Sequence, residues 1–81
     1  MGVAMAVPLQ IKEAIRRIQE AEDLVARQRE RVKRLAARNL PTDASEQLLR
    51  TYERTLEIFR DHLARQERDA RERARALRRR G

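Results

Sequence analysis

Apolar side chains recur with a seven-residue period along two segments of the chain. In the first segment the repeat begins at Ile11, and a second mostly apolar position follows three residues after its members. In the second segment the same pattern begins at Leu49. This spacing places the apolar side chains on one face of a helix and forms the seam that is typical of a coiled coil. The pattern predicts two amphipathic helices.

The two prolines, Pro8 and Pro41, set the limits of these helices. Proline is tolerated at the start of a helix and breaks its interior. We therefore expect one helix over about 8–39, a turn over 39–42 and a second helix over about 43–78. So short a turn makes the two helices antiparallel neighbours.

The turn carries residues suited to ending one helix and starting the next. Asn39 can adopt the left-handed conformation common at a helix end. Thr42 or Asp43 can cap the second helix through a side-chain oxygen, and Glu46 completes a capping box if Asp43 is the cap. The fold class that we predict is all-α, an antiparallel, coiled-coil-like two-helix hairpin in which residues 1–81 form a single domain.

Folding the chain about residue 42 brings the two seams together in layers, for example Val25 with Phe59. We expect the densest layers, and the stable half of the hairpin, to lie nearest the turn. Beyond Leu63 the seam becomes polar, so we expect the termini to fray, the second helix from about Arg75. The predicted hairpin core comprises Ile18, Val25, Val32, Leu35, Leu49, Tyr52, Leu56, Phe59 and Leu63.

One seam position carries a polar residue, Gln28. A buried polar side chain in a coiled coil can fix the register or the choice of partner, or it can simply be tolerated at a hydrated layer. The sequence leaves both interpretations open.

Four apolar residues lie off the seams, where a two-helix hairpin has nothing to cover them. Left exposed, they widen the apolar face to the stripe that is typical of a four-helix bundle, and such patches usually mark an interface. A homodimer is the simplest closure, because one self-complementary patch then serves both chains. A helix from another protein is the alternative occupant. The predicted interface residues are Ile15, Leu24, Leu48 and Ile58.

The charge of the chain suggests a second class of partner, nucleic acid. The formal net charge is +7, and 41% of the residues are charged. Most cations fall in two blocks that a hairpin places at opposite ends, roughly 36 Å apart, where they could contact phosphate groups. Arginine-rich composition also follows from a coding bias, so we rank this alternative second. The candidate contacts are Arg27, Arg29, Arg31, Lys33, Arg34, Arg38, Arg71, Arg73, Arg75, Arg78, Arg79 and Arg80.

Acid–arginine pairs four residues apart support the helices themselves. Seven such pairs occur: Glu13 with Arg17, Asp23 with Arg27, Glu30 with Arg34, Glu46 with Arg50, Asp61 with Arg65, Glu67 with Arg71, and Asp69 with Arg73.

Residues that would carry catalysis or bind a cofactor are scarce. The chain has no cysteine, and its two glycines are Gly2 and Gly81, so a glycine-rich phosphate loop is not expected. His62 is the only histidine, and we expect it to be a polar flank of the core rather than a metal ligand or an acid–base catalyst. We expect no enzymatic activity, no catalytic or metal-binding residue, no cofactor and no small-molecule substrate.

The longest apolar run, Met1 to Leu9, is interrupted by Pro8 and is too short to span a bilayer. The same segment lacks the features of a secretory signal. We expect no membrane association and a cytoplasmic protein.

The stretch from Ala21 to Leu63, about half of the chain, resembles short, uncharacterised helical-hairpin proteins of alphaproteobacteria. These proteins share an Arg-Gln-rich first helix, a turn with Thr, and then paired leucines followed by an acid, Thr and Leu. Their turn often carries Gly-His, where this chain has Asn39-Leu40-Pro41. The resemblance implies a bacterial cytosolic source and adds no catalytic residue. The matching residues are Ala26-Arg27-Gln28, Thr42, Glu46-Gln47-Leu48-Leu49, Thr51-Tyr52-Glu53 and Thr55-Leu56.

Overall fold

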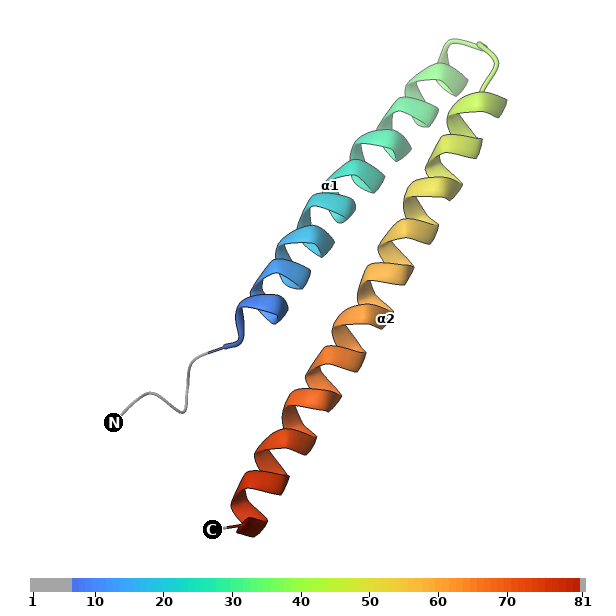
Figure 1. Cartoon of the computed structure of the whole chain (residues 1–81). Coiled ribbons are helices and arrows are strands. Elements are labelled where there is room, and N and C mark those ends of the chain that lie inside the picture. The colour runs from blue at the N-terminus through green and yellow to red at the C-terminus, as the bar shows by residue number, and fades with distance from the viewer. Residues whose placement is uncertain (1–6, 81) are drawn as a thin grey trace.

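The computed structural model describes residues 7–80 and consists of two antiparallel α-helices joined by a short connection (Figure 1). The first helix, α1, spans Leu9–Ala37, and the second, α2, spans Asp43–Arg80. No strand occurs in residues 7–80. The predicted all-α antiparallel hairpin is therefore confirmed. The helix α1 ends two residues before Asn39, and α2 extends two residues past the expected end.

The end of α1 is built around Asn39, which has a φ of 56° and so lies in the left-handed region as expected. The backbone N–H of Asn39 donates to the carbonyl of Ala36, and that of Leu40 donates to the carbonyl of Leu35, both at 3.0 Å. This pair of bonds is the Schellman motif, which satisfies carbonyls that the end of a helix would leave free. The chain thereby leaves the helix axis and can turn back.

The start of α2 depends on Thr42 rather than Asp43. The carbonyl of Thr42 accepts a hydrogen bond from the N–H of Glu46, and its hydroxyl donates to the Glu46 carboxylate, both at 2.8 Å. The capping box expected for Asp43 is thus replaced, because the Glu46 carboxylate binds the Thr42 hydroxyl. Asp43 and Glu46 still place negative charge in the first turn, where the helix dipole favours it.

The hydrophobic core is a small cluster at the centre of the hairpin. It consists of the buried residues Ala21, Val25 and Leu56. Four half-buried residues of the predicted core pack against the cluster, namely Ile18, Leu49, Tyr52 and Phe59. The remaining predicted core residues, Val32, Leu35 and Leu63, are half-buried outside it.

Burial is densest at the centre of the hairpin and along the N-terminal part of α1, not near the turn as expected. The buried residues of α1 are Ile11, Ala14, Ala21, Val25 and Gln28, whereas no residue between 29 and 55 is buried. The seam side chains nearest the turn, Val32, Leu35, Leu49 and Tyr52, are only half-buried.

Gln28 is buried among these apolar residues and has a partner on the other helix. Its side-chain amide nitrogen donates to the carbonyl of Ser45 at 2.8 Å. The bond satisfies a polar group that would be costly to bury alone, and it links the middle of α1 to the first turn of α2.

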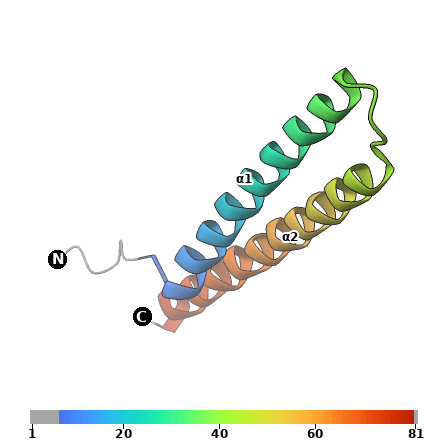
Figure 2. The same ribbon diagram turned by 90° about the horizontal axis from the view of Figure 1, so that it is seen from above.

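The molecule is a rod with extents of 66 × 21 × 13 Å. The two ribbons spread apart toward the open end in Figure 1 and toward the turn in Figure 2, so the helices cross rather than run strictly parallel. The helix α2 continues past the start of α1. All its residues from 71 to 80 are exposed. Fraying from about Arg75 stays a prediction, and the alternative, packing of this tail against residues 3–7, falls mostly on residues outside the described range.

The heptad of α2 offers a matched pair of substitutions to test the core. Leu56 is 7% exposed and Leu77, three heptads later, is 68% exposed. We expect Leu56→Ala to lower the free energy of unfolding by about 2 kcal/mol or more, because it opens a cavity in the central cluster. Leu77→Ala should change it by less than about 0.5 kcal/mol. Urea denaturation at one protein concentration measures both, and equal losses would contradict the position of the core.

Candidate protein interaction surface

Two ion pairs between the helices define one flank of the hairpin. Arg29 pairs with Glu53 at 3.0 Å, and Arg60 pairs with Glu22 at 3.1 Å. The pairs are seven residues apart on each helix, and every member follows a seam residue. We call the side formed by Glu22, Arg29, Glu53 and Arg60 the ion-pair flank.

The ion-pair flank sets alignment more than stability. Each of its side chains is 41% to 59% exposed, and exposed pairs contribute only about 0.2–1 kcal/mol. Their geometry shows how the helices face each other, because residues that follow the seam on α1 meet residues that follow the seam on α2. Residues that precede the seam must then share the opposite flank.

That opposite flank carries an uncharged row of side chains on α2, which we call the neutral stripe and which comprises Leu48, Thr51, Thr55, Ile58 and His62. Its members alternate at spacings of three and four residues, and each precedes a seam residue. Such a row lies along one line of the helix surface. The two largest aliphatic members are well exposed, Leu48 by 41% and Ile58 by 55%. The stripe is thus a second seam without a partner in the hairpin.

The two threonines of the neutral stripe use their hydroxyl groups inside the helix. Thr51 Oγ1 donates to the carbonyl of Gln47 at 3.2 Å, and Thr55 Oγ1 donates to the carbonyl of Thr51 at 3.0 Å. Threonine and serine commonly bond the carbonyl four residues back in this way. The methyl groups remain available for contact, so the stripe is less polar than its composition suggests.

The four residues predicted for the interface are all exposed, but they do not share one face. Leu48 and Ile58 belong to the neutral stripe. Leu24 precedes the seam residue Val25 and lies on the same flank, whereas Ile15 follows Ala14 and lies on the ion-pair flank. The interface predicted as one patch is therefore divided, with Ile15 apart from the other three.

His62 lies at the far end of the neutral stripe, beside the core as expected. It is exposed and lines a small hollow together with Ala14, Arg17 and Phe59. Arg17 also precedes a seam residue, which agrees with the assignment of this flank. No group of three or more side chains suited to holding a metal ion occurs in residues 7–80.

The basic side chains predicted to contact nucleic acid lie toward the two ends of the rod and are all exposed. Near the turn, Arg31, Arg34 and Arg38 surround one shallow hollow with Leu35, while Lys33 lies elsewhere on the helix. Arg27 and Arg29 each pair with a carboxylate. At the other end the Nε of Arg73 donates to the carbonyl of Asp69 at 3.4 Å, and the other predicted contacts at this end are Arg71, Arg75, Arg78, Arg79 and Arg80.

Short-range ion pairs along each helix are fewer than the spacing suggests. Arg16 lies 3.7 Å from Glu20, a pair that was not predicted, and Arg27 lies 3.7 Å from Asp23. Of the seven predicted pairs, Asp23 with Arg27 is the one found within 4 Å among the described side chains. Glu46 binds Thr42 instead.

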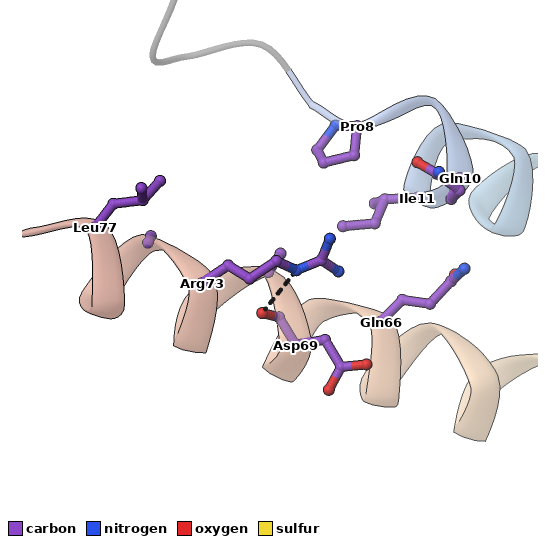
Figure 3. Close-up of a pocket in the computed structure, with 9 residues that line it drawn as sticks. Pro8, Gln10, Ile11, Gln66, Asp69, Arg73 and Leu77 are labelled. Atoms are coloured by element: carbon purple, nitrogen blue, oxygen red, sulfur yellow. Dashed lines mark hydrogen bonds between the residues drawn. The ribbon is translucent and has the colours of Figure 1, made fainter.

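A wider hollow occurs at the open end, where α2 extends beyond the first residue of α1 (Figure 3). Ile11 points from α1 toward α2, and the guanidinium group of Arg73 lies close by. Gln66 also lines the hollow, and its buried side-chain oxygen has no hydrogen-bond partner in the described part of the chain. The hollow marks the place where the apolar seam ends.

Comparison with known proteins adds no functional assignment. No family model matches the chain, and no curated protein or solved structure matches it. Neither described helix has an apolar stretch long enough to cross a membrane. The surface features of the hairpin are therefore the basis for a functional proposal.

The ion-pair flank can be tested with a double-mutant cycle on Glu22 and Arg60. The substitutions Glu22→Gln and Arg60→Gln should show a coupling energy of about 0.2–1 kcal/mol at low salt. The coupling should shrink in 1 M salt, where the screening length is about 3 Å. A matched cycle on Glu22 and Arg50 should show none, because Arg50 lies about 15 Å from Arg60 along α2. Equal coupling in both cycles would contradict the alignment of the helices.

Proposed function

We propose that this chain is a non-enzymatic helical interaction module, which associates with itself or with a helix of a partner protein through the neutral stripe. One observation carries the proposal: Leu48 and Ile58 are exposed within a row free of formal charge. The chain as a whole is 41% charged. An uncharged row of this length on so charged a surface is typical of a helix that packs against another helix.

Homodimer formation is the simplest way to cover the neutral stripe. Two hairpins supply four helices, and four-helix bundles are a common solution for such apolar faces. A two-fold axis lets the same stripe serve both copies. The structural or regulatory role that we assign, together with a bacterial cytoplasmic location and kinship with alphaproteobacterial hairpin proteins, belongs to the same proposal.

Two isoleucines provide a matched test of self-association, because Ile58 lies on the neutral stripe and Ile15 on the ion-pair flank. Light scattering on the purified chain at micromolar concentration should give a mass of about twice the 9.6 kDa of one chain. Ile58→Glu should reduce the mass to one chain, since it places a charge in the apolar contact. Ile15→Glu, the same change on the other flank, should leave the dimer intact.

A well-folded wild-type monomer under these conditions would reject self-association. The stripe would then serve a helix of a different protein. Dissociation by Ile15→Glu but not by Ile58→Glu would contradict the assignment of the interaction surface.

Nucleic-acid binding is the second candidate, and the hollow formed by Arg31, Arg34 and Arg38 favours it. None of these three arginines has a carboxylate within 4 Å among the described residues. Three guanidinium groups around one depression could contact neighbouring phosphates.

Gel retardation at low and moderate salt tests this candidate. Binding through phosphate contacts should be independent of sequence and should collapse as the salt concentration rises. The variant Arg34→Glu/Arg38→Glu should weaken it more than Arg50→Glu/Arg54→Glu, which reverses as many charges away from the hollow. No retardation of DNA or RNA at low salt would remove this candidate.

A further inference from the structure

We propose that the occupant of the neutral stripe is α2 of a second copy of this chain, packed antiparallel, with Arg54 of each copy paired with Asp61 of the other. This inference rests on the proposed function and adds a partner, an orientation and a register. Three features of α2 lead to it: the border of the stripe, the face that remains open to a partner, and the spacing of two opposite charges.

The outer border of the neutral stripe carries the two opposite charges. Arg54 precedes Thr55 and Asp61 precedes His62, so both lie along the edge of the stripe that faces away from α1. Both side chains are exposed. Neither has an ion-pair partner within 4 Å in residues 7–80. A cation and an anion are thus available at a spacing of one heptad.

The orientation follows from which edges meet when two helices pack. An antiparallel pair brings like edges together, as the ion pairs between α1 and α2 already illustrate. A parallel pair of α2 helices would bring the outer border of one copy against the inner edge of the other, where α1 already packs. The antiparallel arrangement leaves both α1 helices in place and brings the two outer borders into contact.

The charges then select one register. Two copies of the stripe stay in phase only when they are shifted by whole heptads. With Arg54 opposite Asp61, Thr55 faces Ile58 and Thr51 faces His62. If one helix is shifted by one heptad, the Arg54 side chains of the two copies face each other. If it is shifted by one heptad the other way, the two Asp61 side chains face each other. Like charges at such positions are unfavourable.

The selected register also uses the whole stripe. All five of its residues fall within the contact, and Leu48 lies opposite Arg65, whose aliphatic stem can cover it while the charge stays in water. A two-fold axis between Thr55 and Ile58 makes both ion pairs equivalent. Leu24 lies on the same flank of α1, so the two α1 helices stand beside the α2 pair and complete a four-helix arrangement.

Charge reversal tests the proposed ion pairs in the full-length chain. Arg54→Glu and Asp61→Arg should each raise the dissociation constant of the dimer by about tenfold or more, because each creates two like-charge contacts. The double variant Arg54→Glu/Asp61→Arg should restore it to within about threefold, since opposite charges face each other again. The controls Arg50→Glu and Glu57→Arg make the same changes one turn earlier, at residues that follow the seam residues Leu49 and Leu56 and lie further from the stripe, and should change it by less than about twofold.

Disulfide trapping tests the orientation independently, because the chain has no cysteine of its own. An equimolar mixture of a Thr51→Cys chain and a His62→Cys chain should form mainly the mixed disulfide on mild oxidation. Predominance of the two homodisulfides would overturn the antiparallel arrangement. Circular dichroism of each variant shows whether the helices are retained.

The two levels of the proposal fail differently. A wild-type chain that stays monomeric in light scattering overturns self-association and this inference with it. A dimer that Ile58→Glu dissociates, but whose dissociation constant is the same with Arg54→Glu as with Arg50→Glu, overturns the inference and leaves the interaction module in place.

Discussion

Within residues 7–80 each helix has the other as its single neighbour, and that constraint governs the rest of the structure. One neighbour covers one side of a helix, so few residues are buried, and Ala21, Val25 and Leu56 form the central cluster. Larger seam residues, including Tyr52 and Phe59, are covered only in part. A small core gives little stability by burial alone. The hairpin is therefore organised by the alignment of its helices as much as by its core.

Polar contacts fix that alignment at several heights along the rod. The Schellman motif at Asn39 and the bonds of Thr42 define the turn. Gln28 joins the middle of α1 to Ser45 at the start of α2. The two interhelical ion pairs then fix one flank. That flank is bordered by charges, whereas the row on the other side of α2 is uncharged, with Leu48 and Ile58 exposed.

The periodic parts of this architecture follow directly from the sequence. A seven-residue apolar repeat specifies which face of each helix is covered, and a proline and an asparagine in the right places specify where the chain turns. These signals are local, because each depends on a few neighbouring residues. They predict both helices, the left-handed Asn39 and most of the core.

Other features depend on how the two helices meet, and sequence spacing does not determine them. The seam layers near the turn look dense in sequence, yet a single neighbouring helix leaves Leu35 and Leu49 partly in solvent. Ile15 follows a seam residue and Leu24 precedes one, and the pairing of Glu22 with Arg60 shows which flank of α2 each of them shares. The sequence contains a signal for that pairing, because opposite charges follow seam residues on the two helices. The signal can be used only when the register of the helices is known.

Small-angle X-ray scattering of the wild-type chain tests the central claim, that a second hairpin packs alongside the first through the neutral stripe. Side-by-side packing predicts twice the mass of one chain with a maximum dimension close to the 66 Å length of the single hairpin, since the shared axis lies within α2. The mass of a single chain, or a doubled mass with nearly doubled length, would contradict it.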